Sequence, residues 1–304
     1  MIERLKNIGR VITITVNSFI QDNCFQYSAS TAFYTLFSLA PIVVISVYVA
    51  GVFFGNESAL LELREFLNTY LGAESTRGVM TLVETIQTNT ENRFFLILSI
   101  FFLIVSSTSI LVQLQYGFNQ IYKVQPHPDV AIRKVFRDRV LAFGMILLLG
   151  AAMVISLVLD SAISAVMNIL SVSALAEQVL LIGIISNLFS FITVMVAIMV
   201  VYYLLPDVKV PLRALIWGSM ITALLLIAGK FIVGIVIGNS SLTQLTGASS
   251  SVIILMLWVY YSGIIIFFGI ELVRSIAKIS EGDIETGKYA RKVKIVEIET
   301  EGEG

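Results

Sequence analysis

The chain has 304 residues, of which 57% are hydrophobic and only 13% charged, and its mean hydropathy is +0.90. This composition excludes an ordinary soluble domain, in which about a quarter of the residues are charged. The formal net charge of −1 argues against a nucleic-acid partner, and the single cysteine, Cys24, cannot form an internal disulfide.

The first segment of the chain, residues 1–28, carries apolar residues at helical spacing after a basic start. This pattern is typical of an amphipathic helix that lies flat on a membrane surface. The same residues also fit a polar extension of the first span, so both interpretations stay open. The apolar run that follows is too long for a signal peptide, and we expect it to be an uncleaved first span.

Six apolar stretches are long enough to cross a bilayer as helices, which takes roughly 20 residues each. Helices are expected because lipid offers no hydrogen-bond partners to the backbone. The six predicted spans are Ala29–Gly55, Phe94–Tyr116, Val140–Leu159, Val179–Leu205, Ala214–Gly238 and Val252–Val273. The sequence therefore predicts an all-α membrane protein with a six-helix membrane domain over residues 29–275.

Two regions outside the spans have a character of their own. The loop after the first span carries two helical patterns, over residues 58–70 and 77–87, which we expect to form short helices on the outer side. The tail, residues 276–304, mixes charges of both signs and is predicted to be a solvated, partly disordered cytoplasmic segment.

The basic residues alternate between the two sides of the predicted spans. The N-terminal segment, the second loop, the fourth loop and the part of the chain after the sixth span together contain 16 Lys and Arg, whereas the other three loops contain 3. Segments rich in Lys and Arg stay in the cytoplasm. Both termini are therefore predicted to be cytoplasmic.

Two ionisable residues within the spans are the first candidates for function, because burying such groups in lipid is costly. Lys230 lies well inside the fifth span and is expected to face the bundle interior, a wet cavity or an anionic headgroup. Snorkelling to the membrane surface is the alternative. Glu271 lies near the cytoplasmic end of the sixth span, with Arg274 one turn later. This pair fits either a gating or coupling carboxylate or a simple interfacial ion pair.

Uncharged polar residues in the spans form a second set of candidates for a substrate path. Polar groups in a span must face protein, where they either join helices or line a path. The candidates are Gln113, Gln115, Asn119, Asn187 and Ser38. Pro41 is expected to kink the first span, because proline lacks a backbone donor.

The sequence contains no pattern typical of a catalytic or metal site. It has no metal-ligand spacing, P-loop or GxSxG elbow, and its one histidine, His127, lies in a constrained QPHPD turn. We therefore predict no catalytic residues, no metal and no cofactor.

Several separated motifs resemble the YihY/BrkB family of bacterial inner-membrane proteins. They are AFYTLFSLAP with GVFFG shortly after it, FNQIYKV, LLPDVKVPLRALIWGSMITALLLIAGK and TGASSSVIILMLWVYYSGIIIFFGIELVR, and the resemblance covers roughly residues 1–275. It implies a multi-pass protein of the bacterial cytoplasmic membrane. The family carries the older name ribonuclease BN, but a ribonuclease needs an acid–base pair or a metal cluster, and the motifs supply neither.

Some members of this family are linked to envelope lipid export, and the resemblance thus implies a lipid translocase. Together with the polar residues in the spans, it leads us to expect a transporter or lipid translocase for anionic lipids or solutes. Membrane lipids are the expected partners, nucleic acid is not, and an oligomer is compatible with the sequence. The alternatives are an enzyme, either the ribonuclease or an intramembrane lipid-modifying activity, and a scaffold for envelope machinery.

Overall fold

The structure is a computed structural model that describes residues 2–36, 38, 61, 64, 80, 93–127, 133–148, 176–239, 248–280, 282, 284–287 and 290–293. Its labelled helices are α1 (Ile2–Gln21), α5 (Arg93–Ile121), α7 (Ala176–Leu204), α8 (Leu212–Asn239) and α10 (Ala248–Ser280). Residues 24–36 and 133–148 are also helical. Each predicted span is helical wherever it is described, except that α7 ends one residue before the predicted Leu205. The predicted helices over 58–70 and 77–87, and Pro41, lie outside the described residues except for isolated positions.

The N-terminal segment forms a helix distinct from the first span. Helix α1 ends at Gln21, and the next helix begins at Cys24. Asn23 between them has a φ of 56°, a left-handed conformation that asparagine tolerates better than most residues. This break argues against a continuous polar extension of the first span. The face of α1 that carries Thr15 and Phe19 is buried, and α1 packs on α10.

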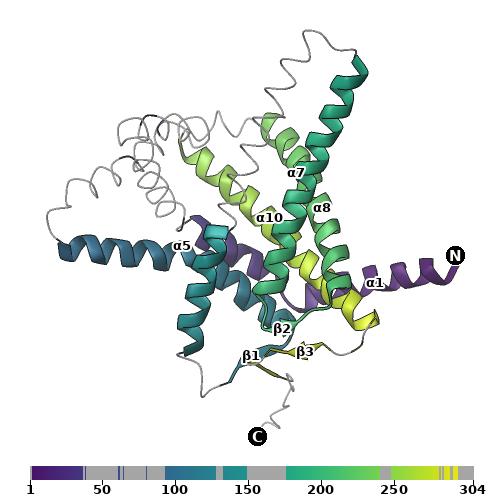
Figure 1. The fold of residues 1–304 in the computed structure, drawn as a ribbon, viewed down its shortest axis with the longest axis horizontal. Coiled ribbons are helices and arrows are strands. Elements are labelled where there is room, and N and C mark those ends of the chain that lie inside the picture. Colours follow the sequence, from purple (N-terminus) through teal and green to yellow (C-terminus); the bar gives the residue numbers. More distant parts are fainter. Residues whose placement is uncertain are drawn as a thin grey trace, which may run out of the picture.

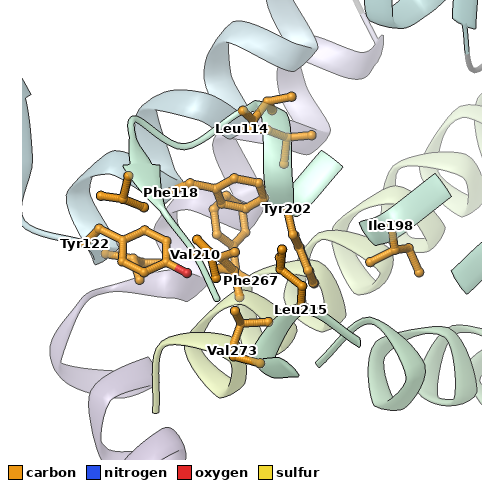
Figure 2. Packing of buried hydrophobic residues seen from close by; sticks show 14 of the residues in the cluster. Leu114, Phe118, Tyr122, Ile198, Tyr202, Val210, Leu215, Phe267 and Val273 are labelled. Atoms are coloured by element: carbon orange, nitrogen blue, oxygen red, sulfur yellow. The ribbon is translucent and has the colours of Figure 1, made fainter. Parts of the chain in front are cut away.

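The bundle is held together by α10, which packs against both α8 and α1, while α7 packs on α8 (Figure 1). Helices α7, α8 and α10 converge towards the short strands, which lie near the C-terminal end of the described chain (Figure 1). The rings of Tyr202 from α7 and Phe267 from α10 lie 5.7 Å and 5.5 Å from that of Phe118 on α5, all edge to face (Figure 2). Aromatic pairs favour this geometry.

Much of the outer surface of the bundle is apolar. Leu188, Ile192 and Val196 are four residues apart on α7 and all are exposed, and Trp217 and Leu224 are exposed on α8. Soluble proteins rarely expose large apolar patches of this kind. Among the described residues, Leu212–Gly229 and Met256–Ser280 are long and apolar enough to cross a membrane, and Leu188–Leu204 is a shorter apolar part of α7.

The described part of the tail forms two strands, which the sequence did not predict. Strand β4 (Ala290–Lys292) pairs antiparallel with β1 (Val124–Pro126), directly after α5. Strand β3 (Glu285–Thr286) pairs with β2 (Val208–Lys209), directly after α7. The backbone N–H groups of Val293 and Gly287 also donate to the carbonyls of Lys123 and Asp207, at 2.9 Å and 2.8 Å. The tail thus connects the second and fourth loops.

Close packing of α10 on α7 and α8 depends on Gly269. A Cβ there would collide with Thr222 Oγ1 and the Tyr202 hydroxyl, both of which are buried. These groups cannot easily move, because Tyr202 donates to the Ile266 carbonyl at 2.7 Å and Thr222 to the Gly218 carbonyl at 2.7 Å.

We expect Gly269→Ala to lower the free energy of unfolding by about 1–3 kcal/mol, the usual cost of overpacking a core. The loss of stability is measured as a lower melting temperature, the temperature at which half of the protein remains monodisperse in size-exclusion chromatography after heating in detergent. Gly144→Ala is the matched control, since a Cβ there meets nothing within 4 Å. Equal melting of the two variants would contradict the packing role of Gly269.

Candidate functional site

Two clusters of polar and mostly charged residues, most of them buried, lie where the helices meet the strands. The Asp22 cluster comprises Asp22, Lys123, Glu271 and Arg274. The Asp207 cluster comprises Asn119, Lys134, Asp138 and Asp207. Both unite segments that are far apart in the sequence, and both lie at the same end of the bundle, since the tail binds the backbone of Lys123 and of Asp207.

The Asp22 cluster is built around a carboxylate that two cations share. Asp22 lies in the turn after α1, and its side chain is largely buried. Its Oδ1 accepts a hydrogen bond from Lys123 Nζ, at the end of α5, and its Oδ2 lies 2.6 Å from Arg274 Nη1, on α10. Burial raises the pKa of Asp22, but the Lys123 hydrogen bond and the charge of Arg274 outweigh burial and hold that pKa below its ordinary value.

Glu271 is the most deeply buried acid of this cluster, with an exposed fraction of 0%. Its carboxylate oxygens lie 3.4 Å and 3.5 Å from Arg274 Nη1. The same nitrogen lies nearer to Asp22 Oδ2, at 2.6 Å. Arg274 therefore holds two acids at once, with the shorter contact to Asp22. The partners come from α10, from the turn after α1 and from the turn after α5, so the cluster fastens three segments together.

Two more groups of the Asp22 region are buried and remain neutral. Burial raises the pKa of the Cys24 thiol, so this cysteine is not a reactive thiolate. Burial likewise raises the pKa of Tyr122. Its hydroxyl has no hydrogen-bond partner among the described residues. An unpaired buried hydroxyl costs free energy. A different arrangement of the helices at this end of the bundle would lower that cost if it gave the Tyr122 hydroxyl a hydrogen-bond partner.

The Asp207 cluster joins the fourth loop to α5 and to helix 133–148. Asp207 and Asn119 pair reciprocally, because Asn119 Nδ2 donates to Asp207 Oδ2 at 2.7 Å and the Asp207 N–H donates to Asn119 Oδ1 at 2.9 Å. Lys134 Nζ lies 2.6 Å from Asp207 Oδ2 and 2.8 Å from Asp138 Oδ2. All four groups are buried or nearly so, and the lysine is paired with two carboxylates.

The residues predicted as a substrate path are dispersed. Glu271 and Asn119 lie at the same end of the bundle but in different clusters. Gln115 is buried on α5, where Gln113 is half-buried. Ser38 donates to the Tyr34 carbonyl of its own helix and joins neither cluster. Lys230 and Asn187 lie on α8 and α7, and their side chains lie outside what the structure describes.

Sequence reasoning missed Asp22, Lys123, Lys134 and Asp207 as site residues. The cytoplasmic bias of basic residues already accounts for both lysines, so neither stood out. The two acids lie in short turns, and their partners are 101 and 88 positions away for Asp22–Lys123 and Asp207–Asn119. Among the described residues, no group of three or more His, Cys, Asp and Glu side chains could hold a metal ion.

Burial distinguishes the Lys134–Asp207 pair from a second pair in the same region. Lys209 and Glu285 also form an ion pair, at 2.9 Å, but their side chains are 73% and 74% exposed. We expect a double-mutant cycle with alanine to give a coupling energy above about 1.5 kcal/mol for Lys134–Asp207. The exposed pair should give about 0.2–1 kcal/mol. Denaturation of the purified protein measures both, and equal coupling would contradict a low-dielectric site.

Comparisons with known proteins agree with the membrane character of the bundle. The family described as Virulence factor BrkB matches residues 15–293 of this chain. A UPF0761 membrane protein from Alcanivorax borkumensis is 25% identical over 297 residues, which cover 97% of this chain and 67% of the relative. No solved structure matches the chain.

Two further relatives are similar over most of this chain. UPF0761 membrane proteins from Pseudomonas paraeruginosa and Laribacter hongkongensis are 28% and 29% identical, and cover 84% and 85% of the chain. The chain spans only 60% and 59% of the length of these two relatives. Because the match to the BrkB family extends over nearly the whole sequence, and the relatives are bacterial proteins named for the membrane, this chain belongs to the BrkB family of bacterial membrane proteins.

Proposed function

We propose that this chain is a multi-pass protein of the bacterial cytoplasmic membrane with both termini in the cytoplasm. The contacts of four segments support this topology: the turn after α1, the second loop, the fourth loop and the tail. They contact one another through both charged clusters and through the pairs β1–β4 and β2–β3. Segments that touch must lie on one side of a membrane. The turn after α1 belongs to the N-terminal segment, and that segment, the second loop, the fourth loop and the tail are the ones rich in Lys and Arg.

The proposed topology also gives α1 a place at the membrane surface. One face of α1 is buried, while Ile12, Val16 and Ile20 are exposed at intervals of four residues. Arg10, on the same helix, is exposed as well. An apolar stripe with basic residues beside it suits the boundary between acyl chains and anionic headgroups. In this proposal α1 lies in the cytoplasmic surface of the membrane.

The function that this arrangement supports best is the movement of an anionic lipid or solute across the membrane, with the Asp22 cluster as the gate on the cytoplasmic side. The burial of Glu271 beside Arg274 and Asp22 carries the proposal. A buried ion pair contributes little net stability, because desolvation offsets much of the attraction. Ionisable residues inside a membrane protein therefore point first to function.

The gate would work by exchanging partners. In the closed arrangement, Arg274 and Lys123 are both paired with Asp22. Separation of the turn after α1 from α10 would uncover these two cations, and an anionic headgroup or solute would replace the carboxylate. Lys230, deeper in α8 by the sequence, would then be a further cationic contact along the path. The buried Tyr122 hydroxyl would gain a partner in the open arrangement.

The topology is tested by labelling introduced cysteines with a membrane-impermeant maleimide. In a Cys24→Ala background, we expect Ser171→Cys, in the predicted third loop, to be labelled in right-side-out membrane vesicles. Arg133→Cys and Glu285→Cys should be labelled only after the vesicles are opened, because both lie on the cytoplasmic side. Labelling of Arg133→Cys and Glu285→Cys from opposite sides would contradict the proposed topology.

Transport is tested in liposomes that contain the purified protein and fluorescent phosphatidylglycerol or phosphatidylcholine. We expect the protein to accelerate the exchange of phosphatidylglycerol between leaflets. Arg274→Gln should lower that rate at least about tenfold, which equals about 1.4 kcal/mol in the barrier. The loss should be specific for the anionic lipid, because the change removes a cation.

Two variants serve as controls for this measurement. Arg213→Gln removes an exposed arginine at the start of α8 and should leave the rate unchanged. Arg274→Lys keeps the charge and should restore part of the activity. A wild-type rate equal to that of protein-free liposomes, for the labelled lipid and for radiolabelled anionic solutes, would overturn the proposed transport.

A further inference from the structure

The other buried or half-buried cations described above pair with carboxylates, whereas the described contacts of Arg139 are all with neutral oxygens. Arg139 lies on helix 133–148, is half-buried, and reaches across to α5. Its Nη1 lies 2.8 Å from the Val105 carbonyl oxygen, 2.8 Å from Thr108 Oγ1 and 3.2 Å from Ser109 Oγ. All three oxygens are neutral and belong to the predicted second span. The neighbouring acid, Asp138, is paired with Lys134 instead.

The hydroxyls of Thr108 and Ser109 orient the guanidinium. Each donates its own proton back to the Val105 carbonyl, at 3.2 Å and 2.7 Å, so each has lone pairs left to accept from Arg139. A guanidinium has five N–H donors in a rigid plane. These contacts use Nη1 only, so in the described part of the chain the edge formed by Nε and Nη2 has no acceptor, and neither atom is among the buried unpaired ones.

Among the described residues, no carboxylate contacts the Arg139 guanidinium, which lies directly before the predicted third span. Neutral oxygens solvate a cation but do not cancel its charge, and a desolvated cation is costly unless it is paired. The free edge of a guanidinium fits two oxygens of a phosphate or carboxylate at once. The site is therefore complementary to an anion.

The surface around Arg139 identifies the kind of anion. On the same helix, Phe136 and Val140 are 73% and 56% exposed, and Phe143 is also exposed. Phe101 is exposed on α5. A soluble anion gains nothing from such a surface, whereas acyl chains bury it. Arg133, two turns earlier on the helix and exposed, adds positive charge towards the predicted cytoplasmic end.

We propose that Arg139 binds the phosphate of an anionic phospholipid from the cytoplasmic leaflet, with the acyl chains against Phe136, Val140 and Phe101. Thr108 and Ser109 are positioning residues that hold the guanidinium. The inference rests on the proposed function only in placing helix 133–148 in the membrane. Binding here requires no transport, and the site is separate from the Asp22 cluster.

Native mass spectrometry of the detergent-purified protein, titrated with phosphatidylglycerol, phosphatidylcholine or inorganic phosphate, tests this site. We expect phosphatidylglycerol to be retained in preference to phosphatidylcholine. Arg139→Gln should weaken phosphatidylglycerol binding at least about tenfold. Arg139→Lys should weaken it less, because the charge stays while the two-point contact is lost. Arg213→Gln, which removes an exposed arginine at the start of α8 and outside this site, should have little effect.

Each contrary outcome is decisive. Unchanged phosphatidylglycerol binding in Arg139→Gln would overturn the site, and so would inorganic phosphate that competes as well as the lipid. If Arg139→Gln does not fold, Arg139→Lys and Thr108→Val carry the test, and full binding in both would overturn it. If the wild-type protein does not exchange lipid but binds phosphatidylglycerol in a way that depends on Arg139, the result counts against the proposed transport and not against this site.

Discussion

The cost of removing charge from water governs this end of the molecule. Lys123, Lys134 and Arg274 each pair with a carboxylate, and the acids come from other parts of the chain or from an adjacent turn of the same helix. Since an unpaired buried charge costs several kcal/mol, these pairs determine which turns must meet. Asp22 and Arg274 are separated by 252 positions, so this one ion pair joins an early and a late segment of the chain.

The aromatic core and the charged clusters depend on each other through adjacent residues. On α5, Phe118 packs in the core beside Tyr202 and Phe267, while Asn119, the next residue, faces Asp207. On α10, Ile270 is buried beside Glu271. A rotation of either helix would disturb apolar packing and ionic pairing together. This coupling gives the proposed gate a rigid support, because a close-packed core switches between discrete arrangements more readily than it deforms.

The helices could be predicted from the sequence, and the clusters could not. Long apolar runs identify helices because lipid leaves the backbone no other choice, and the described parts of the predicted spans are helical apart from the terminal Leu205. The Glu271–Arg274 pair followed from its spacing within one helix. Asp22, Lys134 and Asp207 were missed because their partners are set by the packing of separate helices. Strands of two or three residues carry no readable alternation, which is why β3 and β4 were also missed.

The strands of the tail bear on how this protein can be handled. Residues 285–292 provide the partners for the edges that follow α5 and α7, and they are synthesised after both. A fluorescent or affinity tag fused directly behind Ser280 would leave β1 and β2 with open edges, and the same holds for a shortened gene that stops there. Fusions that retain the chain through Val293 keep both edges covered, so reporters belong beyond that residue.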